Sequence, residues 1–119
     1  GMYYCLNFVT EKKDVPCAIL IRGCEIVHGI ELATLNRYGK ETSNLTKSQI
    51  KNISNGPGKL CKAFGIDKSF NYHDLTGDTL FVCESIPDLT KQVNNVEKSK
   101  RINISYAEEA ADFLWRFTG

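Results

Sequence analysis

The segment N-G-P-G-K-L-C-K-A-F-G, residues 55–65, constrains the local structure of this chain more than any other stretch. Proline suits the first turn of a helix, where the N–H that it lacks would be unpaired, so Pro57 predicts a helix start. Gly65 predicts the helix end, since glycine readily adopts the left-handed conformation that stops a helix. Asn55 is expected to cap the first turn. Two apolar residues at i,i+4 spacing are expected to face the core, Leu60 and Phe64.

The residue types at this helix start favour an anion as ligand. Gly56 and Gly58 have no side chains, so backbone N–H groups can approach a phosphate closely. A helix N-terminus carries partial positive charge, and Lys59 adds a full charge, with Lys62 following. The spacing is not that of a Walker A loop. A capped helix on a glycine turn, without any ligand, explains the same residues.

Local charge is more informative than the net charge of +1. Residues 42–66 contain four lysines and no acid, and a second basic group comprises Lys98, Lys100 and Arg101. Such groups can be solvated faces, and they indicate a nucleic acid only when they flank a phosphate-binding element. No apolar run reaches the roughly 20 residues of a membrane span, so no membrane partner is expected.

Two apolar runs near the start, residues 2–10 and 17–22, predict strands that pair as an antiparallel hairpin. Helical patterns follow, the first closed by Gly39. The fold class predicted for residues 1–119 is a single α+β domain with an antiparallel curved sheet and several short helices. The remaining expected elements are helices at 30–38, 45–53 and 107–114 and short strands at 80–83 and 101–105.

Five cysteines without a C-x-x-C pair argue against a zinc site and against a disulfide framework. Most lie among apolar neighbours and are expected to be small buried side chains in a reducing cytosol. Lys12, Lys13 and Asp14 interrupt the region where a signal peptide would be apolar, which also favours a cytoplasmic location. Neither a metal nor a cofactor is predicted.

Two polar residues in the apolar runs are candidates for ligand binding. Asn7, on a strand rich in aromatic residues, could read a base edge while aromatic rings stack on bases. The alternative is a core strand with one polar residue. Arg22 ends the second apolar run, so it is either a surface terminus or a buried cation that needs a partner.

In their order and spacing, these pieces resemble the alkyladenine (3-methyladenine) DNA glycosylase family. The matching stretches are G-M-Y-Y-C-L-N-F-V-T, A-I-L-I-R-G-C-E, N-G-P-G-K-L-C-K-A-F-G-I-D, D-L, K-R-I-N-I and W-R-F, which span residues 1–117. The resemblance implies a partial alkyladenine glycosylase fold, similar to the C-terminal domain of formyltransferases. It implies an enzyme of base excision repair, in the cytosol or nucleoid, that flips a damaged purine out of duplex DNA and hydrolyses its N-glycosidic bond.

The resemblance also implies roles for single residues. Asn7 matches the pocket asparagine that disfavours normal guanine, and Arg22 matches the arginine that helps to hold the catalytic water. Ile102 is assigned to the substrate pocket, within residues 101–104 whose match supplies a backbone carbonyl to that water. The residues assigned to DNA binding are Met2 and Tyr3, which match a wedge hairpin, and Gly56, Gly58, Lys59 and Lys62.

Some residues depart from the family pattern. The family has R-A-L-E-P where this chain has R-G-C-E-I, so Gly23, Cys24 and Ile26 differ; Leu114 replaces a proline, and Asn103 replaces a glycine. These changes put the packing near the pocket in question.

The family's general-base glutamate lies upstream of the Y-G-M motif, in which this chain opens. We therefore expect an N-terminally truncated form with little or no activity alone, since a general base is worth typically 10²–10⁴-fold. Gly1 is either the native glycine of that motif or a residue added before Met2. The alternatives are a non-catalytic DNA-binding or damage-sensing module and a folded fragment without function. Self-association through a free strand edge is expected.

Overall fold

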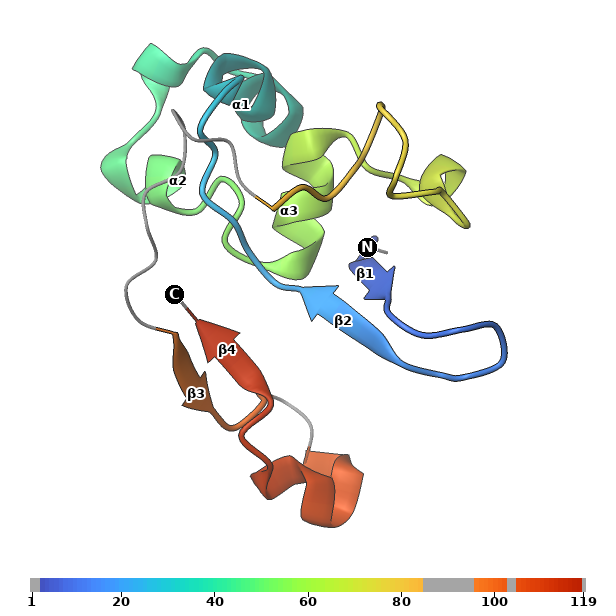
Figure 1. The fold of residues 1–119 in the computed structure, drawn as a ribbon. Helices are drawn as coiled ribbons and strands as arrows, with labels where there is room; N and C mark the ends of the chain where they lie inside the picture. The colour runs from blue at the N-terminus through green and yellow to red at the C-terminus, as the bar shows by residue number, and fades with distance from the viewer. Residues whose placement is uncertain (1–2, 85–95, 103–104, 119) are drawn as a thin grey trace. The chain divides into compact units, whose positions relative to one another are not determined.

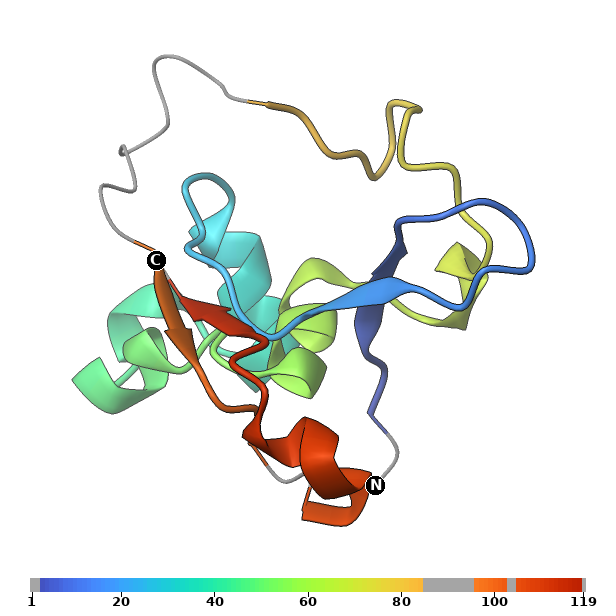
Figure 2. The same cartoon turned by 60° about the horizontal axis from the view of Figure 1, so that its bottom comes forward.

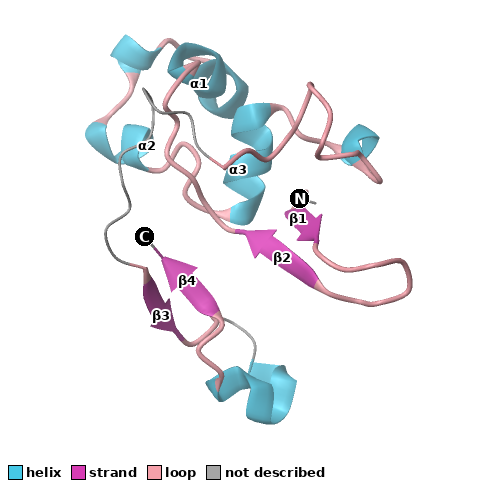
Figure 3. Ribbon diagram, viewed as in Figure 1, coloured by secondary structure: helices cyan, strands magenta, loops and turns pink. Residues whose placement is uncertain are grey.

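The computed structural model describes residues 3–84, 96–102 and 105–118. The chain divides into two compact units, Gly1–Val82 and Cys83–Gly119 (Figure 1). The predicted fold class is confirmed, because the structure combines short antiparallel strand pairs with several short helices (Figure 3). The described strands form two sheets of two strands each. That the chain forms one domain stays a prediction.

The predicted hairpin is present in the first unit. Strands β1 (Leu6–Val9) and β2 (Ala18–Ile21) pair antiparallel, with Leu6 opposite Ile21. Both strands are shorter than the predicted runs. Side chains alternate between the two faces of a strand, so Asn7 lies on the face opposite to that of Leu6 and Ile21.

The first two helices begin and end at identifiable capping residues. Helix α1 (Ile30–Tyr38) has the predicted bounds and ends at Gly39, whose φ of 64° is left-handed. Helix α2 (Lys47–Lys51) is shorter than predicted, because Thr46 caps its start. The Thr46 hydroxyl accepts from the Gln49 N–H at 3.2 Å, and the Gln49 side-chain oxygen accepts from the Thr46 N–H at 2.9 Å. A 3₁₀ helix, Thr42–Asn44, connects α1 and α2.

Helix α3 (Pro57–Phe64) starts at the predicted proline and ends at Gly65, whose φ is 64°. The residue at its N-cap is Gly56, so the prediction that Asn55 caps the helix is wrong. The prediction for Phe64 is also wrong, because this residue is 46% exposed. Gly65 reverses the direction of the chain, so that Ile66 rather than Phe64 lies in the core.

Helix α3 is the centre of the first unit and contributes to two core clusters. Figures 1 and 2 show it between α1 and β1. One cluster comprises Ala33, Ile53 and Ala63, with Ile26, Ile30, Tyr38 and Leu45 packed against it. The other comprises Leu60, Cys61 and Ile66, with Leu6, Ile21, Phe70 and Leu80 packed against it. Both α1 and the hairpin therefore hold α3 in place.

The cysteines and two predicted elements of the later chain differ from expectation. Cys61 is buried, but the other four cysteines are exposed, so the prediction of mostly buried thiols is wrong. The predicted strand at residues 80–83 is wrong, because these residues are irregular and their side chains are largely exposed. They pair with no strand of the described residues, although the Val82 N–H donates to the Leu75 carbonyl at 3.2 Å. The predicted helix at 107–114 is a 3₁₀ segment, Ser105–Asp112, interrupted at Glu108, where φ is 54°.

The second unit contains strands β3 (Glu97–Ser99) and β4 (Arg116–Thr118), paired antiparallel. The predicted strand at 101–105 is wrong for the described residues: 101–102 are irregular and Ser105 begins the 3₁₀ segment. Residues 103–104 lie outside the described residues. The Lys98 ammonium lies 5.9 Å from the centre of the Phe117 ring, its partner across the sheet.

The described residues lack both a membrane-spanning helix and a cluster of metal-ligating side chains. In the ranges given above, no helix is long and apolar enough to cross a membrane. Across the same residues, no three side chains of the metal-ligating types gather into a group.

Candidate nucleic-acid interface

The turn that precedes α3 is held on one side by the chain that follows β2. Gly23 forms an antiparallel bridge with Asn55, and the Ser54 hydroxyl donates a hydrogen bond to the Cys24 carbonyl at 2.7 Å. A side chain at position 23 would lie only 3.3 Å from the Ser54 carbonyl oxygen. The residues directly after Arg22 therefore run along the start of α3.

The other side of this turn is held by Arg37, in the last turn of α1. Its Nε donates to the Ile53 carbonyl at 2.8 Å, and one Nη group lies 3.5 Å from the Asn52 carbonyl. The neighbouring Tyr38 hydroxyl donates to the Gln49 carbonyl at 3.0 Å. Sequence reasoning missed Arg37, for which the one available signal was a basic residue near a helix C-terminus.

Gly56 adopts a backbone conformation that is essentially restricted to glycine, with φ 141° and ψ 148°. The stem of Lys59 folds back over it, with Cδ 3.5 Å from where a side chain at position 56 would begin. The first helical bond runs from the Leu60 N–H to the Gly56 carbonyl at 2.8 Å. The N-cap residue, Gly56, has no side chain that could accept from the first turn, so the N–H groups of that turn point out of the helix start.

Tyr3 lies on the first turn of α3. A side chain at Gly58 would meet the Tyr3 Cβ at 2.8 Å and its ring carbons Cγ and Cδ1 at 2.9 Å. Tyr3 is nevertheless 77% exposed. The structure therefore brings four of the predicted DNA-binding residues, Tyr3, Gly56, Gly58 and Lys59, to one end of one helix.

The other predicted site residues lie around this point or apart from it. Lys62 is exposed one turn along α3, and Arg22 is exposed after β2, which favours the surface-terminus alternative for the arginine. Asn7 is exposed on the hairpin face that points away from the core cluster at α3. Ile102 belongs to the second unit and is exposed there, and Met2 lies outside the described residues.

The Cys24 thiol adds no negative charge beside the helix start. Burial raises the pKa of the Cys24 thiol, an effect that the Ser54 hydroxyl offsets in part, so this thiol is neutral at physiological pH although the residue is partly exposed. In the second unit, Lys100 is paired with Asp112 at 2.9 Å. That pair is exposed and reduces the net charge of the second basic group.

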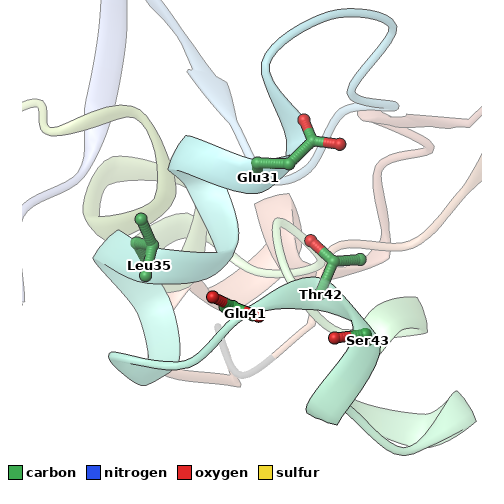
Figure 4. Close-up of a pocket in the computed structure, with 5 residues that line it drawn as sticks. All are labelled: Glu31, Leu35, Glu41, Thr42 and Ser43. Carbon is green, nitrogen blue, oxygen red and sulfur yellow. The ribbon is translucent and has the colours of Figure 1, made fainter.

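A separate open depression of about 460 Å³ lies on α1 and the segment after it (Figure 4). Its lining residues are Glu31, Leu35, Glu41, Thr42 and Ser43. Two carboxylates make this depression unsuited to a phosphate. It shares no residue with the interface at the start of α3.

The sequence of this chain is similar to those of several known proteins. The chain matches the family model described as methylpurine-DNA glycosylase over residues 1–119. It is 52% identical over 117 residues to a protein of Clostridium novyi (strain NT), covering 98% of this chain and 56% of that protein. It is 46% identical over 123 residues to a protein of Clostridioides difficile (strain 630), covering 98% of this chain and 61% of that protein.

A third relative, from Desulfitobacterium hafniense (strain Y51), is 47% identical over 117 residues, with 98% of this chain and 56% of that protein covered. All three relatives are provisionally named 3-methyladenine DNA glycosylases. The chain spans somewhat more than half the length of these relatives. Because the family model matches the chain from end to end, the chain belongs to the methylpurine-DNA glycosylase family.

Proposed function

We propose that this chain binds the backbone of damaged duplex DNA at the start of α3, as part of a glycosylase of base excision repair. One observation carries the proposal: Tyr3, the Gly23–Asn55 bridge and the Lys59 stem meet at that helix start. Outward-pointing N–H groups, a helix dipole and an ammonium group together suit a phosphate. Family membership makes the phosphate of DNA the expected ligand.

The charges around the helix start support the same ligand. Lys59 and Lys62 are exposed, and residues 42–66 include no carboxylate that would repel a phosphate. Contacts within the protein also hold the turn, because Arg37, Cys24 and Gly23 bond to residues 52–55. A preformed site loses less conformational freedom on binding and so binds more tightly.

For the base itself, we propose the roles that the family resemblance implies. Asn7 would crowd the exocyclic amine of normal guanine, Ile102 would line the pocket, and Arg22 would hold the water that attacks the sugar carbon. That attack breaks the N-glycosidic bond and releases the purine, leaving an abasic site. In the family that the chain resembles, the general base is a glutamate that lies upstream of the Y-G-M motif, and residues 1–119 contain no match to it. The 119 residues tested alone are therefore expected to bind without turnover.

Fluorescence anisotropy with a hypoxanthine-containing duplex tests the binding. Affinity should fall steeply with salt, because each neutralised phosphate contributes about 0.9 to the slope of log affinity against log salt. Lys59→Gln should reduce that slope by about 0.9. Lys68→Gln removes the same charge from the 3₁₀ helix Lys68–Phe70, beyond the other end of α3, and should leave the slope unchanged. Equal slopes for both variants would refute the assigned contact.

A chromatographic assay of released hypoxanthine tests the chemistry. Robust turnover by the 119-residue chain would contradict the proposal that the general base lies outside it. Binding without turnover agrees both with this proposal and with a non-catalytic damage-sensing module. Adding an upstream segment that supplies a carboxylate distinguishes these two alternatives. Turnover should appear if the chain is part of a glycosylase and should stay absent if it is a damage-sensing module.

We also propose that the hairpin associates with a second copy of the chain. Val9 and Ile19 expose large apolar surfaces on its two strands, and strand edges readily pair with other chains. Light scattering well above micromolar concentration should show a dimer or a larger species. The variant Ile19→Lys should shift it to monomer, and a monomeric wild-type chain would refute association.

A further inference from the structure

The contact between Tyr3 and Gly58 cannot accommodate any side chain at position 58. The Cβ of an alanine there would lie 2.8 Å from the Tyr3 Cβ and 2.9 Å from two ring carbons. Optimal separations between non-bonded carbons are about 3.5–4.0 Å. The nearest atom is the Tyr3 Cβ, beside the backbone, so a ring rotation alone does not relieve the clash.

The backbone at Gly58 does not itself require glycine. Gly58 lies inside α3, whereas the glycines with positive φ are at the ends of helices: Gly29, Gly39, Gly56 and Gly65. Glycine lowers helix stability relative to alanine, so its presence at position 58 is unfavourable for α3 alone. The contact with Tyr3 explains why a glycine stands at position 58, because any side chain there would overlap with Tyr3.

We propose that Gly58 is a positioning residue that seats the Tyr3 ring on the turn that binds phosphate. The inference rests on the proposed function and deepens it. Gly58 lies between Gly56 and Lys59, so the aromatic ring and the phosphate-binding groups keep a constant separation. Tyr3 is 77% exposed, which leaves ring surface free to stack on a base of the strand whose phosphate is bound.

This arrangement couples two otherwise independent contacts with DNA. The phosphate contact alone is insensitive to base identity and pairing. In an intact duplex, the neighbouring bases cover both faces of each base. A ring held at a set distance from the bound phosphate can therefore stack on a base only where the stack has opened. Seating of Tyr3 on Gly58 would therefore convert backbone binding into a preference for disturbed base pairs.

The test uses the 119-residue chain and a duplex with 2-aminopurine beside hypoxanthine, whose fluorescence rises when the stack is opened. Gly58→Ala should weaken binding to this duplex by between about 5-fold and 150-fold, the range for loss of one base–aromatic contact. It should also suppress the fluorescence rise at protein concentrations that saturate the duplex. Gly77→Ala is the matched control, because a side chain there meets only the Asp74 carbonyl at an ordinary 3.5 Å.

A double-mutant cycle separates the Tyr3 contact from a general effect on α3. Tyr3→Gly removes all three atoms that clash, so adding Gly58→Ala to it should change affinity by less than about twofold. An equal loss in both backgrounds, or a Gly58→Ala variant that matches Gly77→Ala, would overturn the inference. If the wild-type chain does not bind the duplex, both the proposed function and this inference are wrong.

Discussion

Replacing Arg37 with methionine should destabilise the first unit by about 2 kcal/mol. The half-buried guanidinium donates to the Ile53 carbonyl at 2.8 Å, and hydrogen bonds to a charged group are each worth about 1.5–3 kcal/mol. The second contact, to the Asn52 carbonyl at 3.5 Å, is long and adds little. For a chain of this length, a loss of 2 kcal/mol lowers the melting temperature by roughly 8 °C.

Urea denaturation followed by circular dichroism measures the loss. Lys40→Met, an exposed charge just after α1, is the matched control and should change stability by less than about 0.5 kcal/mol. Hydrogen exchange should also accelerate in residues 52–56, which Arg37 holds. A variant as stable as the control would show that the turn before α3 keeps its shape without Arg37, and the reasoning would be wrong.

Three further predictions concern the core, a helix cap and a thiol. Leu60→Ala should cost about 2–5 kcal/mol in urea denaturation, and Phe64→Ala much less, because Leu60 is buried and Phe64 is 46% exposed; similar losses would contradict the assigned core. Thr46→Ala should cost about 1 kcal/mol through loss of the capping box, a loss that Thr46→Ser should largely avoid. Burial, with a smaller contribution from Cys5, raises the pKa of the Cys61 thiol, so iodoacetamide should alkylate it more slowly than Cys83. Because the unfolded thiol ionises first, this group's stabilising contribution is complete below the ordinary thiol pKa and declines as pH rises above it; a contribution that grows over that range would contradict the burial.

The sequence predicted most reliably those elements whose ends depend on local chemistry. Pro57 and Gly65 bound α3, and Gly39 ends α1, because the allowed backbone angles of proline and glycine act on the nearest turn alone. The antiparallel hairpin was also predicted, although the predicted strands are longer than the observed ones. Its apolar runs continue beyond the residues that pair.

Predictions that depended on distant parts of the chain were less successful. Phe64 has the right spacing for the core, but Ile66 takes that place after the reversal at Gly65. The cysteines lie among apolar neighbours in sequence, yet four of the five are exposed, because neighbours along a strand or loop do not cover one another. Residues 80–83 have a strand-like composition but do not form a strand in this structure.

The candidate site shows the same difference between features set by local sequence and features set by distant contacts. While their role in phosphate binding stays a prediction, the glycines and Lys59 could be placed at a helix start from the sequence. Arg37 could not, because the carbonyl that it binds lies 16 residues away. The contact of Tyr3 with Gly58 joins residues 55 positions apart, and no local pattern of either segment indicates it.

The position of α3 between two core clusters has a consequence for the thermodynamics of DNA binding. Leu60, Cys61 and Ala63 are buried directly after the turn at Gly56 and Lys59, so the turn belongs to a well-packed part of the unit. Protein segments that fold only on contact with DNA lose conformational entropy and show a large negative heat-capacity change. A phosphate bound at α3 should require no such folding. Calorimetry should therefore show a small heat-capacity change, and the salt dependence of the affinity should show that ion release contributes to binding.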